Sequence, residues 1–422
     1  MDINQALQKL YSMRQFNIKL GLDNVMGLLE FIGNPHKKLK CFHIAGSNGK
    51  GSTASFLSSI LIEHGYKTGL YTSPHLVRFN ERIRINGVEI DDDYIGKFIQ
   101  EIDEYIIQHE PTFFEITTAL AFKYFYENDV DYAVIEVGLG GRLDATNLIE
   151  NPIACLITSI SLEHTNILGN DLSKIAWEKA GIIKPNSKVF IGNLVSEAEL
   201  SIEKVVEEKN AVLIPLMKNL ELFNDHVELL VKGKTFKIYE LPLLGKHQYL
   251  NAALAVLSFT KTFEIFNELK ISKGLRNVIA NSGHSCRLEK VNDSPEIIFD
   301  AAHNLEGLET LLNFIRSRKQ NYSELNVLFG VSNDKNYEEM IIKLSKIFNN
   351  IYISSFNYPK ALPTSELKAA AVKNHISVIE VLDKIAFIEK YKTTEKFDSL
   401  LVVMGSIYML GEILSEKNVK IS

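Results

Sequence analysis

The chain of 422 residues is long enough for two domains, and its 46% hydrophobic and 23% charged residues are typical proportions for a folded globular protein. Its net charge of −6 argues against a general binder of nucleic acid or membrane surfaces. The stretch from Met1 to Phe16 lacks the apolar core of a signal peptide, no apolar run approaches about 18 residues, and the three cysteines have no C-x-x-C spacing. We therefore expect a cytoplasmic protein with reduced thiols.

The chain begins with a predicted helical region over residues 1–39, followed by a short apolar strand predicted over 41–45. The strand stops at a loop with three glycines and one lysine, and a helical pattern follows directly. Strand, glycine-rich turn and helix together present backbone N–H groups and a helix N-terminus to a phosphate. Lys50 would reach the β- and γ-phosphates, and a hydroxyl just beyond it would meet Mg²⁺. The loop reads Gly46-Ser47-Asn48-Gly49-Lys50-Gly51.

This loop matches the P-loop pattern G-x-x-x-x-G-K-[ST] imperfectly. The pattern requires glycine at position 44 and serine or threonine at position 51, where the chain has Ile44 and Gly51. The hydroxyls come one step later, at Ser52 and Thr53. The alternative is a glycine-rich turn that closes an ordinary parallel sheet without binding a nucleotide.

Two further apolar strands follow, over 67–73 and 132–138, with helices predicted between them over 91–109 and 113–128. The stretch 78–84 holds three arginines, which suit a solvated loop and an anion site equally well. Glu136 interrupts the second strand, and a buried carboxylate without a partner would cost several kcal/mol or become protonated. Metal coordination or a cationic partner would resolve this cost.

His164 lies just beyond a buried strand over 153–160, a place where a histidine is either structural or a ligand. The next predicted helix, 172–181, contains Lys179. A strand over 188–192, a helix over 197–209, short strands over 212–240 with a turn at 232–234, and helices over 249–263 and 267–280 complete the first domain.

A break near 281–286 separates a second, smaller domain, where strands and helices alternate again. We predict a parallel α/β domain and place the boundaries at 1–281 for the first domain, 282–286 for the linker and 287–422 for the second domain. The predicted strands cover 296–300, 326–330, 350–356 and 399–405, and the predicted helices cover 305–318, 337–347, 364–373, 382–391 and the residues from 407.

Several blocks of this sequence, taken together, resemble the folylpolyglutamate synthase/dihydrofolate synthase family, a branch of the Mur ligases. The resemblance covers nearly the whole chain. It implies an N-terminal P-loop ATPase-like α/β domain with a parallel sheet and a smaller C-terminal Rossmann-like domain. The blocks are HIAGSNGKGST, GLYTSPHLVRFNERI, FFEITTALAF, AVIEVGLGGRLDATN, ITSISLEHTNILG, IAWEKAGIIK, LLGKHQYLNAALA, DAAHN and GSIYMLGE.

The implied reaction is ATP-dependent amide ligation. The γ-phosphate of ATP passes to a carboxylate of a pteroate or folate, and the amino group of L-glutamate attacks the acyl phosphate. The resemblance implies dihydropteroate or a reduced folate as the acceptor, and we expect both to be used. Small molecules, with no nucleic acid and no membrane, are the expected partners of a monomeric enzyme.

The same resemblance implies roles for residues of the first domain. Lys50 and Lys179 would be catalytic, and Lys179 would be carbamylated so that it helps to bind the second of two Mg²⁺ ions. Without the resemblance, Lys179 is a surface lysine in the last turn of a helix. The phosphate contacts would be Gly46, Ser47, Asn48, Gly49, Lys50, Gly51 and Ser52, and the metal ligands Ser73, Glu136 and His164 with Ser52.

Further roles implied by the resemblance concern adenine, glutamate and folate. Asn251 would contact adenine, although it equally suits a helix-surface amide, and Arg287 would contact the phosphates, although it equally suits a linker cation. Ser406 is a candidate for glutamate binding or for an N-cap. The expected glutamate contacts are Asp300, His303, which is also expected to be catalytic, and Ser406; the expected folate contacts are Arg82 and Asp144.

Some positions depart from the family pattern. Ser47 replaces a usual threonine, Glu163 replaces a usual aspartate, and 282–287 replaces a usual Pro-Gly-Arg approach. None of these changes removes a charge assigned to catalysis, so we expect an active enzyme. The alternatives are a Mur-type ligase acting on a cell-wall nucleotide and a non-catalytic ATP-binding regulator. An NAD-dependent oxidoreductase is disfavoured because neither domain has G-x-G-x-x-G after its first strand.

Overall fold

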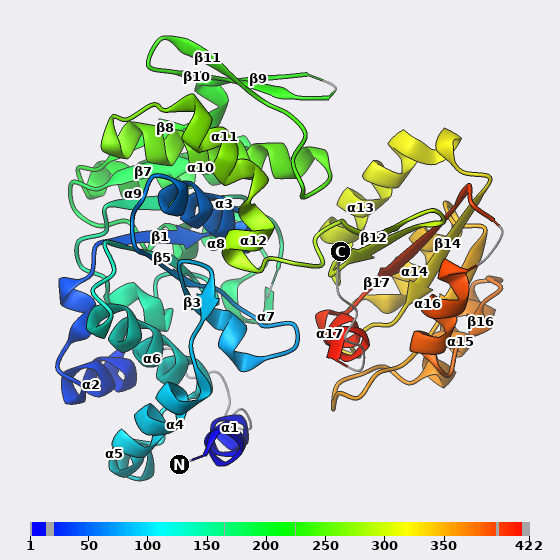
Figure 1. Cartoon of the computed structure of the whole chain (residues 1–422), viewed down its shortest axis with the longest axis horizontal. Helices are drawn as coiled ribbons and strands as arrows, with labels where there is room; N and C mark the ends of the chain where they lie inside the picture. The colour runs from blue at the N-terminus through cyan, green and yellow to red at the C-terminus, as the bar shows by residue number, and fades with distance from the viewer. Residues whose placement is uncertain (1, 14–20, 164, 224, 394–395, 416–422) are drawn as a thin grey trace. The chain divides into compact units, whose positions relative to one another are not determined.

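The computed structural model describes residues 2–13, 21–163, 165–223, 225–393 and 396–415. The chain forms two compact units (Figure 1). The first unit comprises Met1–His75, Phe79–Leu241 and Gln248–His284. The second comprises Leu76–Arg78, Pro242–His247 and Ser285–Ser422.

The first unit is built on an eight-stranded sheet in the order β4-β3-β2-β5-β1-β6-β7-β8. The neighbouring strands β2, β5, β1, β6, β7 and β8 pair in parallel. At the other end of the sheet, β3 and β4 extend the edge as antiparallel strands. The glycine-rich loop therefore follows a central strand. The strands are β1 (Cys41–Ala45), β2 (Thr68–Tyr71), β3 (Ile83–Ile85), β4 (Val88–Glu89), β5 (Tyr132–Glu136), β6 (Ala154–Ile157), β7 (Lys188–Ile191) and β8 (Val212–Pro215).

Helices cover both faces of this sheet, because successive strand residues point to opposite sides. Cys41 and Ile135 belong to a core built with α1, α2, α4, α5 and α6, whereas the ring of Phe42 packs at a tilt against Phe263 of α10. The helices are α1 (Ile3–Ser12), α2 (Asp23–Phe31), α3 (Lys50–Glu63), α4 (Asp92–Glu101), α5 (Asp103–His109), α6 (Phe113–Glu127), α7 (Thr165–Leu168), α8 (Leu172–Ala180), α9 (Ser196–Glu208), α10 (Lys246–Phe263), α11 (Glu268–Arg276) and α12 (Val278–Ser282), with 3-10 turns at Pro35–Lys38, Phe79–Arg82, Ala145–Leu148 and Leu216–Lys218.

Some predicted elements differ in detail. The helix predicted over 91–109 divides at Ile102, which leaves helical geometry at ψ 11° and ends α4. Part of the arginine-rich stretch becomes β3 rather than a loop, because it pairs with β2. The predicted turn at 232–234 is confirmed: Lys232 and Gly233 have positive φ and join β10 (Val227–Val231) to β11 (Lys234–Ile238). These strands and β9 (Leu220–Leu222) form a separate three-stranded sheet.

The second unit holds a six-stranded sheet in the order β12-β13-β17-β14-β15-β16. The predicted parallel α/β arrangement holds from β13 to β16, and one edge differs from it, because β12 pairs antiparallel with β13. Polar Lys290 and Asn292 flank an irregularity in β12 and hide its strand pattern. The strands are β12 (Glu289–Asp293), β13 (Glu296–Asp300), β14 (Glu324–Phe329), β15 (Asn350–Ile353), β16 (Ile379–Glu380) and β17 (Ser399–Met404), and the helices are α13 (Leu305–Arg318), α14 (Tyr337–Ser345), α15 (Thr364–Lys373), α16 (Lys384–Lys392) and α17 (Ile407–Ser415), with a 3-10 turn at Lys319–Asn321.

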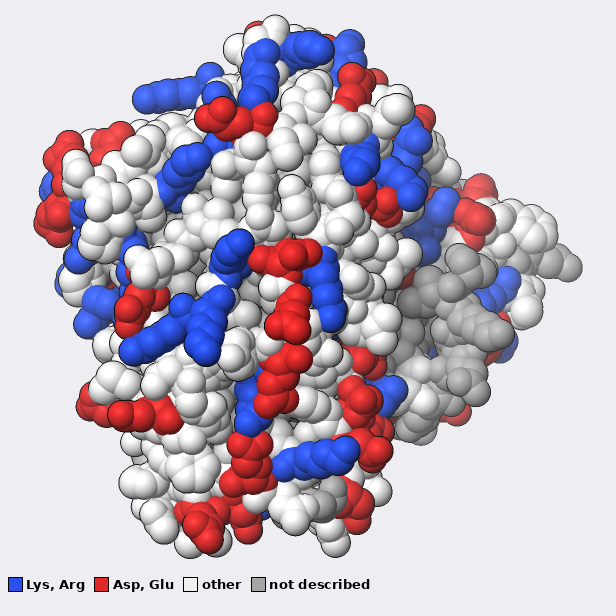
Figure 2. All heavy atoms as spheres, turned by 60° about the vertical axis from the view of Figure 1, so that its left-hand side comes forward, with Lys and Arg blue, Asp and Glu red and all other residues white. Residues whose placement is uncertain are grey.

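The α/β fold class is confirmed in both units. All three cysteines are buried free thiols, as expected. No helix among the described residues is both long and apolar enough to cross a membrane. On the face shown in Figure 2, acidic side chains form a run near the middle of the view, and lysines and arginines lie on either side of it.

Candidate functional site

The candidate site lies where four adjacent parallel strands of the first unit end. β2, β5, β1 and β6 are neighbours in this order, so their carboxyl ends meet along one edge of the sheet. Ser73 follows β2, Glu136 ends β5, the glycine-rich loop follows β1, and Thr158 follows β6. Ligands commonly bind at this edge in α/β sheets.

The glycines of the loop permit a backbone that other residues would resist. Gly46 has φ 147°, and a Cβ atom there would lie 2.0 Å from Thr158 Oγ1. Gly49 has φ 84° and caps α3, and a Cβ atom there would lie 2.4 Å from Asn251 Oδ1. The loop therefore packs too closely against its neighbours to carry side chains at these two positions.

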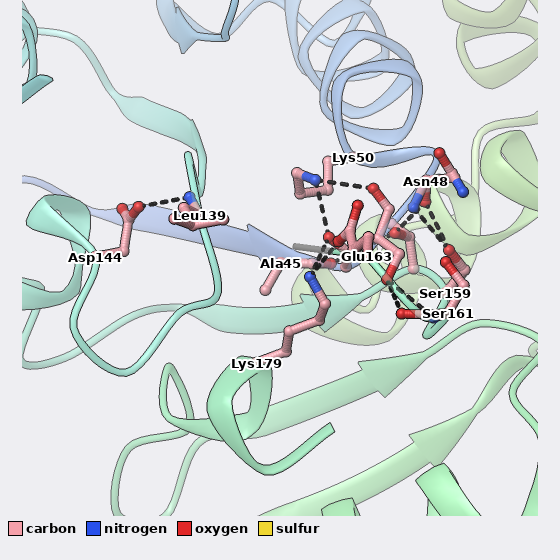
Figure 3. A network of polar contacts seen from close by, with 12 residues as sticks. Ala45, Asn48, Lys50, Leu139, Asp144, Ser159, Ser161, Glu163 and Lys179 are labelled. Carbon is pink, nitrogen blue, oxygen red and sulfur yellow. Dashed lines mark hydrogen bonds and ion pairs between the residues drawn. The ribbon is translucent and has the colours of Figure 1, made fainter. Parts of the chain in front are cut away.

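Residues after β6 hold the loop in place through hydrogen bonds to its backbone N–H and carbonyl groups (Figure 3). Asn48 N–H donates to Ser159 Oγ at 2.9 Å, and the carbonyl oxygen of Asn48 accepts from Thr158 Oγ1 at 2.6 Å. Ser47 N–H donates to the carbonyl oxygen of Ser159 at 2.8 Å, and Ser47 Oγ accepts from Ser161 N–H at 2.9 Å. Since these bonds fix the loop before a ligand arrives, its remaining N–H groups are preorganised.

Lys50 and Lys179 converge on the loop from opposite sides (Figure 3). Lys50 Nζ donates to the carbonyl oxygens of Gly46 and Ser47 at 2.8 and 2.9 Å. Lys179 Nζ donates to the carbonyl oxygen of Gly46 and to Glu163 Oε1, each at 2.8 Å. The two lysines are thus brought together at one end of the candidate phosphate site.

Lys179 is buried, with 1% of its surface exposed, so the alternative of a surface lysine was wrong. The pKa of Lys179 is lowered to about 8, chiefly by burial and also by the nearby charge of Lys50, while Glu163 opposes both effects. A buried amine with a pKa near neutrality is partly uncharged and therefore nucleophilic. Burial and close charge together make this lysine chemically distinct.

Glu136 and the oxygens around it offer a candidate cation site. Its side chain is 4% exposed, and Glu136 Oε2 accepts from Ser73 N–H at 2.8 Å. Both carboxylate oxygens lie 3.6 Å from where a Cβ atom of Gly51 would be, so the carboxylate faces the loop. A buried carboxylate with serine hydroxyls nearby fits Mg²⁺, which prefers oxygen ligands and keeps several waters.

His164 lies outside the described residues. Within the described chain, no cluster of three or more histidine, cysteine, aspartate or glutamate side chains is arranged to hold a metal ion. A cation here would therefore depend on Glu136, serine oxygens, water and nucleotide phosphates together.

Sequence reasoning missed His284. Ser52, on the first turn of α3, is 4% exposed, and its Oγ lies 3.1 Å from His284 Nε2. A Cβ atom on Gly51 would lie 3.1 Å from His284 Cε1. No sequence signal indicated this contact, because 232 residues separate Ser52 from His284.

Asn251, the candidate adenine contact, lies on α10 and is 9% exposed, so it is not a helix-surface amide. Its Nδ2 donates to Gln248 Oε1 at 3.0 Å, which directs Oδ1 toward Gly49. Asn251 therefore lies beside the loop, and its contact with adenine stays a prediction.

The two candidate folate residues are both buried. Arg82 Nε donates to His75 Nδ1 at 2.8 Å, and its guanidinium lies over the ring of Phe113. Asp144 accepts from Leu139 N–H at 2.8 Å and from both the N–H and the hydroxyl of Thr146. Burial raises the pKa of Asp144, and these hydrogen bonds oppose the rise. Asp144 holds its own loop, and both folate contacts stay predictions.

The predicted glutamate residues of the second unit lie at the ends of adjacent strands. Asp300 ends β13 beside Met404 of β17, and Ser406 lies two residues after the end of β17. Asp300 accepts from Leu288 N–H at 2.8 Å and Ala302 N–H at 2.9 Å; burial raises its pKa, and Arg287 opposes the rise. Ser406 Oγ accepts from Tyr408 N–H, which supports the N-cap alternative. His303 Nδ1 contacts the carbonyl oxygen of Ala301 at 2.9 Å.

Comparisons with known proteins give matches in both units. Residues 44–259 match the Mur ligase middle domain, and residues 286–407 match the Mur ligase glutamate ligase domain. The dihydrofolate synthase/folylpolyglutamate synthase of Bacillus subtilis is 37% identical over 420 residues, covering 94% of this chain and 95% of that protein.

Solved structures give the same result. The structure of Escherichia coli FolC in complex with DHPP and ADP matches with a TM-score of 0.89 at 28% identity. The match covers 100% of this chain and 99% of that one. The Yersinia pestis folylpolyglutamate synthase/dihydrofolate synthase complexed with AMPPNP and Mn ion has a TM-score of 0.85 at 27% identity, covering 99% and 98% of the two chains.

Proposed function

The chain belongs to the Mur ligase family, in its dihydrofolate synthase/folylpolyglutamate synthase branch, and from this premise we propose that it joins L-glutamate to a pteroate or folate carboxylate. It is an ATP-dependent ligase that acts on small molecules and uses a divalent metal ion. The observation that supports the activity most strongly is the preorganised loop, with Lys50 beside it at the carboxyl ends of β2, β5, β1 and β6.

The first step of the reaction must overcome repulsion between negative charges. A carboxylate must approach a nucleotide whose phosphates are themselves anionic, so cations and N–H donors must offset the repulsion. Lys50 and the N–H groups of Gly46–Gly51 would hold the phosphates. The carboxylate oxygen attacks the γ-phosphorus and ADP leaves; the glutamate nitrogen then attacks the acyl carbon, and phosphate leaves as the amide forms.

Glu136, Ser73, Ser52 and His164 are the residues that would hold the first Mg²⁺. When bound, the ion neutralises phosphate charge and orients the transferring group. Ser73 is anchored by its own N–H on Glu136 Oε2, so the two residues would act as a unit. This anchoring keeps the carboxylate facing the loop before nucleotide arrives.

Carbamylation of Lys179 would supply a ligand for a second Mg²⁺. The uncharged amine attacks the carbon of CO₂, loses a proton to solvent and becomes an anionic carbamate. With its pKa near 8, about one Lys179 in ten is uncharged at pH 7, whereas an exposed lysine is almost wholly charged. Glu163 would have to release Lys179 as the charge changes sign, because the two carboxylates would repel each other.

In the second unit, Asp300 and His303 would place the incoming glutamate, with Ser406 on the adjoining strand end. A buried carboxylate suits the amino group of glutamate, because it would pair with the ammonium and help to orient the nitrogen. Arg287 would contact phosphates, Asn251 the adenine, and Arg82 and Asp144 the folate. We retain 1–281 and 287–422 as functional domains with 282–286 as the linker, and a cytoplasmic monomer as the expected state.

One assay tests the proposal. Purified chain, MgATP and labelled glutamate are combined with dihydropteroate or with tetrahydrofolate in separate reactions, and ADP and labelled product are measured. Dihydropteroate- and tetrahydrofolate-dependent incorporation is expected, since relatives carry both names. Absence of ADP release with either acceptor from folded, metal-supplied protein would refute the proposal.

A further inference from the structure

His284, just after α12, lies beside the first turn of α3 and has no role among those predicted from the sequence. Its Nε2 lies 3.1 Å from Ser52 Oγ, and its Cε1 lies 3.1 Å from where a Cβ atom of Gly51 would be. The Glu136 carboxylate lies 3.6 Å from the same Cβ position. Imidazole, hydroxyl and carboxylate therefore gather around the first turn of α3, all within the first unit.

The hydroxyl proton of Ser52 has a restricted choice of acceptors. A serine inside a helix commonly donates to the carbonyl oxygen four residues earlier. For Ser52 this is the carbonyl oxygen of Asn48, which already accepts from Thr158 Oγ1 at 2.6 Å and from Ser159 Oγ at 3.0 Å. A carbonyl oxygen has two lone pairs, so both are in use. The acceptor offered by the contact described for Ser52 Oγ is His284 Nε2, at 3.1 Å.

This choice decides what Ser52 presents to a ligand. If its proton is directed to His284 Nε2, the oxygen lone pairs face away from the imidazole and can accept from another partner. A hydroxyl oxygen binds a cation through those lone pairs. The imidazole must then be neutral, with its own proton on Nδ1.

We propose that His284 is a positioning residue for the divalent cation that accompanies the nucleotide: it accepts the Ser52 hydroxyl proton and so turns the Ser52 oxygen toward the cation. This inference rests on the proposed function for the presence of a nucleotide and cation. It adds a residue to the site and assigns it a role through Ser52, without contact between His284 and the phosphates.

Binding of Mn²⁺ in the presence of AMPPNP tests the role without turnover. The full chain is titrated with Mn²⁺ and followed by electron paramagnetic resonance, for the wild type, H284A, H284Q and S52A, and for the double variant H284A/S52A. Removal of a residue that orients a metal ligand typically weakens metal binding by about 10- to 100-fold. We expect H284A to lose about 10-fold and H284Q to stay within about 3-fold, because a glutamine oxygen can accept near the Nε2 position.

Two comparisons separate positioning from a merely structural role. Because His284 acts through Ser52, the double variant should bind Mn²⁺ as weakly as S52A and no more weakly. H109A, at an exposed histidine in the last turn of α5, is the matched control and should bind like the wild type. Circular dichroism checks folding, and H284Q carries the test if H284A does not fold.

The proposal would be overturned by wild-type Mn²⁺ affinity in H284A, by equal losses in H284Q and H284A, or by full additivity of H284A and S52A. Loss of AMPPNP affinity in H284A without metal would also overturn it, since it would place His284 on the phosphates. The proposed function fails by a different result, absence of acceptor-dependent ADP release from the wild type. The Mn²⁺ titration needs no acceptor, so the two failures are distinguishable.

Discussion

The ammonium groups of Lys50 and Lys179 donate to one acceptor, the carbonyl oxygen of Gly46, each at 2.8 Å. Two cations share this oxygen, but only Lys179 also pairs with a carboxylate, that of Glu163. Lys179 is almost wholly buried. The two lysines therefore differ in character. Lys50 stays available to a ligand, whereas burial makes the charged form of Lys179 unfavourable in free energy.

The pH dependence of stability should reveal that cost. The pKa of Lys179 is lowered from 10.5 to about 8, so the unfolded chain binds its proton more tightly than the folded chain does. Between pH 8 and 10.5 this lysine makes stability rise with pH, by at most roughly 3 kcal/mol in total. K179M removes this contribution. In CO₂-free buffer, the wild type should gain melting temperature relative to K179M between pH 7.5 and 9.5; parallel curves would contradict the lowered pKa.

Replacement of Lys50 by alanine should abolish ligation while leaving the fold intact. Lys50 bonds only to carbonyl oxygens of its own loop among the contacts described for it, so its loss removes little from the core. We expect acceptor-dependent ADP release to fall by at least about 10²-fold, because a preorganised cation opposite developing charge is lost. K97A, at an exposed lysine of α4, is the control. An active K50A enzyme with normal circular dichroism would contradict the role of Lys50.

A carboxylate supplied from solution should partly restore a K179A enzyme. If carbamylated Lys179 contributes an anionic ligand, K179A is inactive, and acetate or another short carboxylic acid can occupy the space left by the side chain. ADP release is measured across a range of acid concentrations, with chloride at matched ionic strength as the control. Failure of every short acid and of bicarbonate to restore turnover in folded K179A would argue strongly against the carbamate.

Much of the site's placement was predictable from sequence. Glu136 and Gly46 stand at the ends of apolar runs, and parallel strands joined by helices bring such ends to one edge of the sheet. The α/β class follows from the same alternation. The position of the glycine-rich loop and of the strand ends around it could therefore be predicted from local sequence patterns together with the general rules for strand order and handedness.

Other features depend on partners distant in sequence. Lys179 looked like a surface lysine because its burial arises from Gly46 and Glu163, which lie on other segments. The Ser52–His284 contact was missed for the same reason. β12 was missed because its pairing with β13 is interrupted, which hides the alternation of a strand.

Replacement of Gly46 by alanine isolates the cost of close packing. Gly46 and Gly21 have nearly the same backbone angle, φ 147° and 148°, but a Cβ atom at Gly46 meets Thr158 Oγ1 at 2.0 Å, whereas one at Gly21 meets no atom of the described residues within 4 Å. G21A therefore carries the backbone strain alone, on the order of 1–3 kcal/mol, and G46A carries the strain and the clash. Denaturant unfolding should show G46A as clearly the less stable variant. Equal losses would mean that the loop moves away from Thr158 without cost.

A buried chain of hydrogen bonds runs from His43 through Thr146 to Asp144. Thr146 Oγ1 lies 2.5 Å from Asp144 Oδ1 and 2.8 Å from His43 Nε2. An ionised carboxylate only accepts, so the hydroxyl donates to Asp144 and His43 Nε2–H donates to the hydroxyl. Burial lowers the pKa of His43 to about 3, which keeps the imidazole neutral.

T146V replaces that hydroxyl by a methyl group and leaves a buried N–H donor and a buried carboxylate without their shared partner. We expect T146V to lose about 1–3 kcal/mol of unfolding free energy, the typical cost of a buried group left unsatisfied. T146S keeps the hydroxyl and should lose less, and the difference between the two variants measures the network rather than the lost methyl group. Because Asp144 also accepts from Leu139 N–H at 2.8 Å, amide hydrogen exchange of Leu139 should accelerate in T146V but not in T146S. Equal exchange rates in both variants would show that Asp144 holds its loop without help from Thr146.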